Sequence, residues 1–319
     1  MVKISFCVTY YNQAKFVEQS INSILSLEIP CDFEILIGDD GSTDDTIAKI
    51  KKWQKQYPDI IKFFVMPRKN GMIYNAIHRA SENRLNLVRN AMGDYIMFLD
   101  GDDFYCDKSF VREALKQFNE NDNLIACAFN FEYFYPKDDS IKVFEQNMQN
   151  GIIDINNGYI PCGGYIPCGA IIFKNIFDKD KITLCEKSKN FDDNLITIYI
   201  FQFGKVYFIN KPIYAYRQTD NSVWNSMIEY EQYLLNAMDY EIISRVAPKF
   251  KKALAKRQFY AIRQVFKVRK RLFELLGKEK FDKYVKENAE TNNDFILKLL
   301  LSHLISPTSL RFDLRSVLP

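Results

Sequence analysis

Apolar residues in the first third of the chain alternate between two spacings. Short apolar runs have the length and composition of β-strands, at residues 4–9, 33–37 and 61–65. Two stretches place apolar side chains on one helical face and end shortly before a proline, residues 14–27 and 44–57. This order of strands and helices predicts βαβ units around a mainly parallel sheet.

A further apolar run, residues 95–99, ends in a strongly polar turn. Polar clusters thus follow three expected strands, at Thr9 to Asn12, Asp39 to Ser42 and Asp100 to Asp103. Ligands of open α/β sheets bind outside the carboxyl ends of the strands. We therefore expect these clusters to bring carboxylates, aromatic rings and amides to one crevice.

The second half of the chain carries weaker local signals. Residues 191–203 favour a helix, and residues 205–209 favour a strand that ends before Pro212. The hexapeptide Gly-Tyr-Ile-Pro-Cys-Gly occurs twice in succession, at residues 158–163 and 164–169. Two copies are too few for a solenoid. A duplication tolerated in a loop and a loop shaped for a ligand both stay open.

The amino-acid composition limits the classes of protein to which the chain can belong. The 319 residues, 47% hydrophobic and 26% charged, are typical of a globular chain of about two domains, which excludes a disordered protein. The net charge of +3 gives no reason to expect nucleic acid. Seven cysteines without a Cys-x-x-Cys pair, and no secretory signal after Met1, predict reduced thiols in the cytoplasm. His78 and His303 are the only histidines, which leaves little material for a Ser-His or Cys-His mechanism.

The positive charge is concentrated near the C-terminus. Residues 245–280 hold 13 Lys or Arg and two Glu, a local net charge of +11, interleaved with apolar side chains. Such a basic amphipathic segment fits a solvated helical face, an anionic membrane surface or an acidic polymer. The longest uncharged stretch, residues 155–173, contains two prolines and four glycines, and the apolar residues 295–305 are too few to cross a bilayer. We expect no transmembrane span.

The acidic clusters suggest a cation site. Carboxylates gathered without neighbouring lysines favour Mg²⁺ or Mn²⁺, bound by one or two carboxylates together with substrate phosphates. Asp and Gly are also common turn formers, so one such cluster alone has a structural explanation. The turn at Asp100 does not fit an EF-hand, because Phe104 stands where an oxygen ligand is needed. No Walker or dinucleotide-binding glycine motif is present in the sequence.

Several motifs in a fixed order carry a family resemblance. They are Ser5-Phe6-Cys7-Val8-Thr9-Tyr10-Tyr11-Asn12, Ile37-Gly38-Asp39-Asp40-Gly41-Ser42-Thr43-Asp44, Gly93-Asp94-Tyr95-Ile96-Met97-Phe98-Leu99-Asp100-Gly101-Asp102-Asp103, Asp192-Asp193, and Tyr216-Arg217 before Ser222. Over residues 1–225 this set resembles the family 2 glycosyltransferases with the GT-A fold. The resemblance implies an α/β fold with a Rossmann-like, mainly parallel sheet flanked by helices. A nucleotide-sugar half, about 1–107, would be followed by an acceptor half, about 108–225, and by a helical basic region at 226–319.

The resemblance also implies roles for residues on the donor side. Tyr11 would stack on a uracil base lined by Thr9 and Asn12, Asp40 would accept a hydrogen bond from the uracil ring, and Asp39 would support that turn. The D-x-D element would comprise Asp100, reaching ribose or metal, Gly101, and Asp102 as the direct ligand of Mn²⁺ or Mg²⁺. Asp103 would face the sugar. Arg84 stands where the family often has an Arg-Asn pair, although Leu85 replaces the Asn.

The catalytic role implied by the resemblance falls on Asp192 and Asp193, where the family commonly has Glu-Asp. Asp193 would deprotonate an acceptor hydroxyl that attacks the anomeric carbon, with inversion. A helix N-terminus explains two aspartates equally well without the resemblance. Trp224 could stack on an acceptor sugar or pack in the core.

These inferences predict a metal-dependent inverting glycosyltransferase that uses a UDP-sugar and a glycan or lipid-linked acceptor, in capsule or lipooligosaccharide synthesis. We expect it in the cytoplasm, at the inner face of the membrane if the basic segment binds lipid; a homodimer through the C-terminal helices stays open. A sugar nucleotidyltransferase is the alternative enzyme, although it needs a glycine-rich basic loop where Tyr10-Tyr11-Asn12-Gln13 stands. A non-catalytic nucleotide or glycan binder is the third alternative.

Overall fold

The computed structural model describes residues 3–69, 76–146, 148–153, 166–186, 191–219, 229–265 and 267. Two compact units make up the chain. The first comprises residues 1–223 and 242–253, and the second comprises residues 224–241 and 254–319. The first copy of the hexapeptide, Ser222, Trp224, His303 and the apolar residues 295–305 lie outside the described residues.

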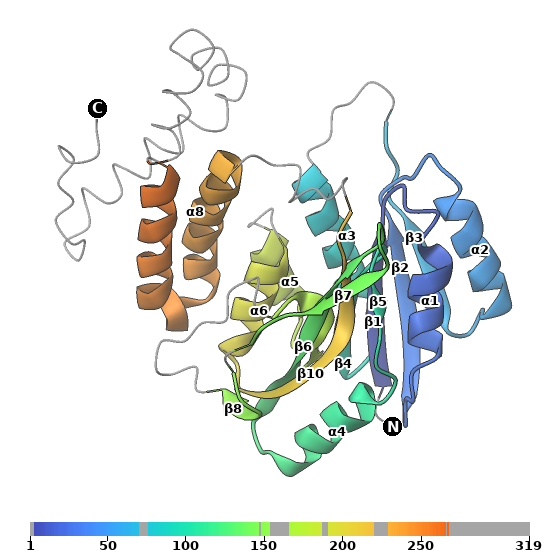
Figure 1. Ribbon diagram of the computed structural model, residues 1–319, viewed down its shortest axis with the longest axis horizontal. Coiled ribbons are helices and arrows are strands. Elements are labelled where there is room, and N and C mark those ends of the chain that lie inside the picture. Colours follow the sequence, from blue (N-terminus) through green and yellow to red (C-terminus); the bar gives the residue numbers. More distant parts are fainter. Residues whose placement is uncertain are drawn as a thin grey trace, which may run out of the picture. The chain divides into compact units, whose positions relative to one another are not determined.

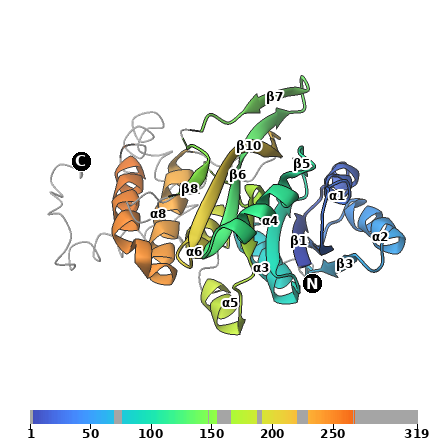
Figure 2. The ribbon, with the colours of Figure 1, turned by 90° about the horizontal axis from the view of Figure 1, so that it is seen from below.

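A single mixed sheet organises the first unit (Figure 1). Its strands are β1 (Lys3–Tyr10), β2 (Asp32–Asp39), β3 (Ile61–Val65), β4 (Tyr95–Asp100), β5 (Phe104–Tyr105), β6 (Leu124–Tyr135), β7 (Ser140–Val143), β8 (Gly151–Ile153), β9 (Ile171–Lys174) and β10 (Lys205–Arg217). The order is β3-β2-β1-β4-β9-β6-β10-β5, with β7 on β6 and β8 on β10. The strands from β3 to β4 are parallel, whereas β9 is antiparallel to both β4 and β6. The hairpin of β6 and β7 extends outward at one end (Figure 2).

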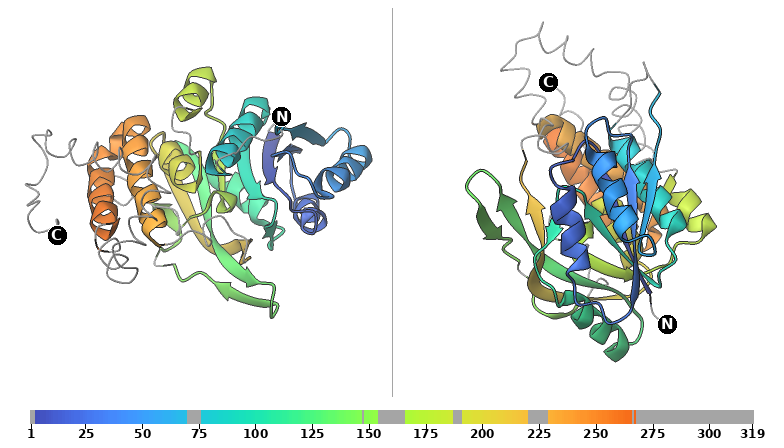
Figure 3. Two further views of the ribbon diagram at one scale, coloured as in Figure 1. Left: turned by 90° about the horizontal axis from the view of Figure 1, so that it is seen from above. Right: turned by 90° about the vertical axis from the view of Figure 1, so that its right-hand side faces the viewer.

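Helices cover both faces of this sheet. They are α1 (Val17–Leu25), α2 (Thr46–Gln56), α3 (Ala76–Asn90), α4 (Phe110–Glu120), α5 (Lys179–Glu186) and α6 (Asp193–Phe201), with the 3₁₀ turn η1 at Cys168–Ala170. The apolar faces of α1, α2 and α4 join one core cluster with alternate residues of the sheet. Helix α3, which returns the chain from β3 to β4, lies on the opposite side of the sheet from α1 (Figure 3). This is the arrangement expected of right-handed crossovers in an α/β sheet.

The expected strands and helices of residues 3–107 are present within a few residues of their predicted limits. Strand β1 is buried along nearly its whole length, as expected for an inner strand of a parallel sheet, and its buried polar residue Ser5 donates to Glu34 at 2.8 Å. The strand predicted for residues 205–209 was too short. Strand β10 continues through Pro212 to Arg217, because the pairing with β6 shifts register on both sides of the proline and so absorbs the missing N–H donor.

Strand register brings the predicted polar clusters together. Tyr10 pairs with Asp39 across β1 and β2, and Thr9 pairs with Asp100 across β1 and β4. The three parallel strands therefore end at one edge of the sheet. The polar clusters expected to share a crevice thus lie at one edge, and the predicted α/β fold is confirmed.

The last described elements are helical; residues 229–241 and those from 254 onward belong to the second unit, whereas residues 242–253 belong to the first. Helix α8 spans Glu229–Val246, and a short 3₁₀ turn, η2 (Pro248–Phe250), leads into a helical stretch at residues 251–265. Ala237, Ala261 and Ile262 pack together with Tyr240. Lys256, Arg263 and Lys267 are exposed on the second stretch. Within the part of the chain that the structure describes, no helix combines the length and apolar character required to cross a membrane.

Candidate active site

The turn after β4 is held by two side chains from neighbouring elements. The Nη2 group of Arg84, on α3, donates to both oxygens of Asp100 at 2.7 and 3.0 Å. Thr9 Oγ1, at the end of β1, donates to the same carboxylate at 3.0 Å. Burial disfavours the charged form of Arg84, but its neighbours, Asp100 foremost, outweigh burial and raise the pKa of the guanidinium. Asp100 is thereby fixed in an orientation that the turn alone does not impose.

The other two aspartates of this turn lie in different surroundings. Asp102 is half-buried, and burial, followed by the charge of Asp100, raises its pKa to about 6. Asp103 is buried and accepts hydrogen bonds from the Tyr214 hydroxyl and from the backbone N–H of Arg217, the latter at 2.8 Å. The expectation that Asp103 faces the sugar is therefore wrong. Its carboxylate points into the protein because β10 supplies donors for both of its oxygens.

Close packing of the surrounding atoms requires a glycine at position 101. A Cβ atom on this residue would lie 2.1 Å from Cδ1 of Tyr10 and 2.8 Å from Oε1 of Gln13. No side chain fits in that space, since real Cβ contacts are longer. The glycine allows the turn to lie directly against the end of β1, where its N–H donates to Thr9 O at 2.8 Å.

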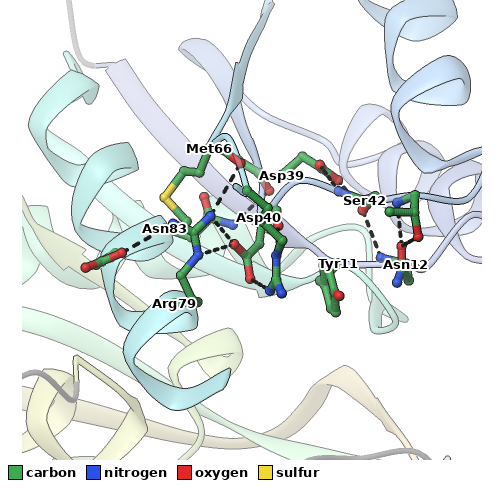
Figure 4. Close-up of polar contacts among 12 residues, drawn as sticks. Tyr11, Asn12, Asp39, Asp40, Ser42, Met66, Arg79 and Asn83 are labelled. Carbon is green, nitrogen blue, oxygen red and sulfur yellow. Dashed lines mark hydrogen bonds and ion pairs between the residues drawn. The ribbon is translucent and has the colours of Figure 1, made fainter. Parts of the chain in front are cut away.

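The turn after β2 is built around Asp39. This buried carboxylate accepts from the N–H and the hydroxyl of Ser42 at 2.7 and 2.6 Å (Figure 4). Burial raises the pKa of Asp39, and these hydrogen bonds oppose the change. Ser42 Oγ in turn accepts from the N–H of Asn12, whose side-chain oxygen accepts from the N–H of Thr43 at 2.8 Å. Asn12 has a φ of 52°, a left-handed conformation that asparagine tolerates.

Asp40 is engaged by two arginines. Arg79, on α3, donates from Nε to the Asp40 carboxylate at 2.5 Å, and Figure 4 shows the two side chains in contact. Arg68, after β3, forms an ion pair with the same carboxylate and donates from Nε to Asp40 O at 2.7 Å. The Arg68 guanidinium also lies over the Tyr11 ring, 4.0 Å from its centroid. A base stacked on Tyr11, which is 44% exposed, must use the other face of the ring or displace Arg68.

Asp192 and Asp193 lie at the start of α6. Asp192 is the N-cap and accepts from the N–H of Leu195 at 3.2 Å, while burial and then the charge of Asp193 raise the pKa of Asp192 to about 6. Asp193 accepts from the N–H of Cys168 at 3.2 Å. Cys168 belongs to the second copy of the hexapeptide, so this copy contributes a backbone contact to the site. Asp100 and Asp193 both act electrostatically on Arg84, and Asp100 also binds it directly.

The residues present can hold a divalent cation only in part. Within the described ranges, no group of three or more His, Cys, Asp or Glu side chains is arranged to hold a metal ion. Asp100 and Asp102 are oxygen donors two positions apart on one turn. Mg²⁺ and similar cations are bound through one or two carboxylates together with substrate phosphates. The donor set fits a cation that binds together with a diphosphate.

The family model described as glycosyl transferase family 2 matches residues 5–180, which include the ends of β1, β2 and β4. The chain belongs to glycosyl transferase family 2. The site at the strand ends thus lies in the part of the chain that defines this family. Asp192 and Asp193 lie beyond the matched residues.

Curated relatives match this glycosyltransferase over part of their length. An uncharacterised glycosyltransferase of Mycoplasma pneumoniae is 38% identical over 103 residues, which are 32% of each chain. The chondroitin synthase of Pasteurella multocida is 32% identical over 126 residues, 40% of this chain and 12% of the synthase. The chain therefore covers about a third or less of these relatives.

Solved structures share the fold. S. aureus TarS 1-349 in complex with UDP-GlcNAc has a TM-score of 0.60 and 16% identity, over 87% of this chain and 77% of that chain. The complex of the same protein with UDP has a TM-score of 0.55 and 16% identity, over 86% and 72% of the two chains. These likenesses establish a GT-A glycosyltransferase fold.

Sequence reasoning missed Arg68, Arg79 and Asn83. Arg68 follows the end of β3, where the rule that ligands bind beyond strand ends would have selected it. Arg79 and Asn83 carried no local signal, because a cation and an amide on a helix are ordinary surface residues. Asn83 Nδ2 donates to Gly38 O at 3.0 Å, which ties α3 to β2 beside Asp40.

Proposed function

We propose that this protein is an inverting glycosyltransferase that uses a UDP-sugar as donor. One observation carries the proposal: β4 and α6 present Asp100 and Asp193 to the same buried cation, Arg84. Such a site would bring a donor-binding carboxylate and a proton-accepting carboxylate near one cation. The complex of TarS with UDP-GlcNAc, a protein of the same fold, supports a uridine nucleotide as the donor.

The donor would lie across the carboxyl ends of the parallel strands. Tyr11, with Thr9 and Asn12, offers an exposed ring and polar groups to the base, and Asp40 with Arg68 offers both an acceptor and donors. Uracil presents both an N–H and carbonyl oxygens, so this mixed set suits it. Asp102, with Asp100, would hold Mn²⁺ or Mg²⁺. The cation, when bound, neutralises the charge that develops on the departing diphosphate.

The proton-transfer step belongs to Asp193. Its carboxylate is oriented by the N–H of Cys168, and it interacts electrostatically with the guanidinium group of Arg84. An acceptor hydroxyl that bonds to Asp193 loses its proton to this carboxylate as the oxygen attacks the anomeric carbon. Attack from the face opposite the leaving nucleoside diphosphate inverts the configuration, so an α-linked donor yields a β-linkage.

We further propose a glycan or lipid-linked acceptor, of the kind used in capsule or lipooligosaccharide synthesis, and attachment to an anionic membrane surface. The exposed residues Lys256, Arg263 and Lys267 lie 7, 4 and 11 positions apart on one helical stretch, a spacing that favours a common face. Tyr260, 58% exposed, lies between them. Cations around an exposed aromatic ring suit the headgroup region of a membrane.

The experiment that tests the donor proposal is thermal unfolding with UDP, GDP, CMP or dTDP, each with and without Mn²⁺. A ligand that binds the folded protein alone raises the unfolding temperature. We expect stabilisation by UDP that depends on Mn²⁺ and is lost in Asp102→Ala. Stabilisation by no nucleotide contradicts the proposal and favours the non-catalytic alternative. The nucleotidyltransferase alternative instead requires formation of a nucleoside diphosphate sugar from a sugar phosphate and a nucleoside triphosphate.

A further inference from the structure

Arg217, the last residue of β10, is one of the most enclosed cations of the described chain. Its exposed fraction is 5%, although guanidinium groups rarely lie so deep without partners. The proposed function assigns it no role. Its contacts converge on the turn after β4.

Three hydrogen bonds connect Arg217 to that turn and to α1. Its Nε donates to the carbonyl oxygen of Asp102 at 2.5 Å, and its backbone N–H donates to Asp103 Oδ1 at 2.8 Å. Its Nη2 donates to Gln19 Oε1, on α1, at 2.6 Å. The two turn residues are thus bound by one arginine that lies 114 positions beyond Asp103 in the chain.

Three aromatic rings surround the guanidinium group of Arg217 and restrict its orientation. The guanidinium carbon lies 4.5 Å from the ring centroid of Phe16, 5.2 Å from that of Phe104 and 5.0 Å from that of Phe134. These rings come from the segment before α1, from β5 and from β6. Cations are attracted to aromatic faces. The packing therefore defines where the fork of donors points.

The contacts of Asp102 differ from those of Asp103, which gives the two residues different roles in the turn. Asp103 gives both carboxylate oxygens to β10, one to Arg217 and one to the Tyr214 hydroxyl, and so anchors the turn. Arg217 binds the backbone oxygen of Asp102 and leaves the Asp102 carboxylate to other ligands. An anchor on the main chain fixes where this carboxylate points without competing for its oxygens.

We propose that Arg217 is a positioning residue, which holds the Asp102–Asp103 turn from β10 so that Asp102 is oriented toward the cation and diphosphate of a donor. The inference rests on the proposed function, since it assigns the donor to this turn. The donor-side turn is thereby supported by a strand of the acceptor half. A bidentate fork is required, so lysine is not an equivalent residue.

The test compares two ligands on purified variants, uridine and UDP with Mn²⁺. Uridine reaches the base side of the crevice, whereas UDP with Mn²⁺ also needs Asp102. In Arg217→Gln we expect affinity for UDP with Mn²⁺ to fall about ten-fold or more, as for other residues that orient metal ligands. Affinity for uridine, measured by NMR titration, should stay within about two-fold, because the Tyr11 side of the site is untouched.

Further variants separate positioning from charge and from folding. Arg217→Lys keeps the charge and loses the fork, so its affinity for UDP with Mn²⁺ should stay several-fold below wild type. Gln19→Ala removes one anchor from an exposed position, keeps the fold and should weaken the same affinity about two- to five-fold. Arg112→Gln, an exposed arginine paired with Glu28, is the matched control and should change neither affinity.

Each of these affinities either supports or contradicts a positioning role of Arg217. Equal weakening for uridine and UDP, or wild-type affinity in Arg217→Lys, overturns the inference, since it indicates a general structural role or a purely electrostatic one. Should the Arg217 variants fail to fold, an unchanged affinity in Gln19→Ala overturns it instead. Failure of the proposed function is distinct, because in that case the wild-type protein itself does not bind UDP with Mn²⁺.

Discussion

Arginine side chains form ion pairs with two of the aspartates of the candidate site. Arg84 binds Asp100, and Arg68 and Arg79 bind Asp40. Asp102 forms no ion pair with any residue of the described ranges, and its pKa is raised to about 6 by burial and then by Asp100. The charge of Arg217, which binds the backbone oxygen of Asp102, opposes this rise only in part. A partly desolvated carboxylate outside any ion pair suits a cation that would arrive with the proposed donor.

Replacing Asp102 by asparagine should separate binding from stability. In the folded protein burial raises the pKa of Asp102 to about 6, from 3.8. Between these values the folded state binds more protons than the unfolded state, so stability declines as the pH rises through this window. Asp102→Asn removes this loss of stability, because asparagine does not ionise. Its free energy of unfolding should exceed wild type by about 1–2 kcal/mol above pH 6, with little difference below about pH 4.

Urea denaturation at acid and neutral pH, followed by the shift with UDP and Mn²⁺, measures both effects. The ligand-induced shift should be absent in Asp102→Asn at either pH. A variant no more stable than wild type at neutral pH would contradict the assigned environment of Asp102. A retained shift would contradict its role as a ligand.

Asp193→Asn should lower the rate and spare donor binding. Asparagine preserves the acceptor for the Cys168 N–H but cannot take a proton. Release of UDP from the donor should slow about 100-fold or more, the usual effect of losing a general base. UDP affinity should be unchanged. The control is Asp178→Asn, since Asp178 is exposed and paired with Lys181 on the surface. An undiminished rate in Asp193→Asn would move the proton acceptor elsewhere.

At the scale of elements, the site depends on short segments pressed against the sheet. The turn η1, which contains the end of the second hexapeptide copy, contacts β4, β6 and β10. Cys168 of this turn binds Asp193, and Gly169 lies against the ring of Tyr214. Tyr214 in turn donates to Asp103. Cys168 and Gly169 of the second copy therefore contribute contacts to the candidate site.

Gly169→Ala should destabilise the fold through this contact. A Cβ atom would lie 2.4 Å from Cε2 of Tyr214, whose ring is held by its hydrogen bond to Asp103. Overpacking of this kind lowers stability by about 1–3 kcal/mol. The check is a double-mutant cycle by urea denaturation. In the Tyr214→Ala background the penalty of Gly169→Ala should largely vanish, and an undiminished penalty would place the clash elsewhere.

At the scale of the whole molecule, opposite charges are concentrated in different parts of the chain. Aspartates gather at the strand ends of the first unit, and residues 245–280 carry a net charge of +11. The exposed cations that the structure describes in the second unit include Lys256, Arg263 and Lys267. The proposed nucleotide site and the exposed basic residues thus occupy different segments, so each can be altered separately.

Reversing the charge of Lys256, Arg263 and Lys267 to Glu should abolish binding to anionic vesicles. Each basic residue near such a surface contributes about 1 kcal/mol, so the loss should exceed about 100-fold. Flotation with vesicles containing phosphatidylserine measures this, with phosphatidylcholine vesicles as the neutral control. The shift with UDP and Mn²⁺ should stay as in wild type. Equal flotation of the reversed and wild-type proteins would exclude this surface as the attachment site.

Local patterns in the sequence were sufficient to predict the first strands and helices of the fold. Alternation of short apolar runs with helical stretches predicted β1 to β4 and the helices α1 and α2, because strand and helix periods depend on neighbouring residues. The acidic turns at Asp39 and Asp100 followed from their position after buried runs. The strand order and the later strands β6 to β9 had no such local signal.

Only the tertiary structure decided what each polar residue does. Arg84 and Asp100 are 16 positions apart, Arg68 and Asp40 are 28 apart, and Arg217 and Asp103 are 114 apart. Such pairs depend on strand register and on which helix covers which face of the sheet. The sequence by itself therefore determined the α/β fold and the candidate carboxylates. The fold decided that the Asp103 carboxylate binds β10 whereas the Asp102 carboxylate forms no ion pair within the described ranges, because hydrogen-bond partners come from residues that meet only when the sheet is assembled.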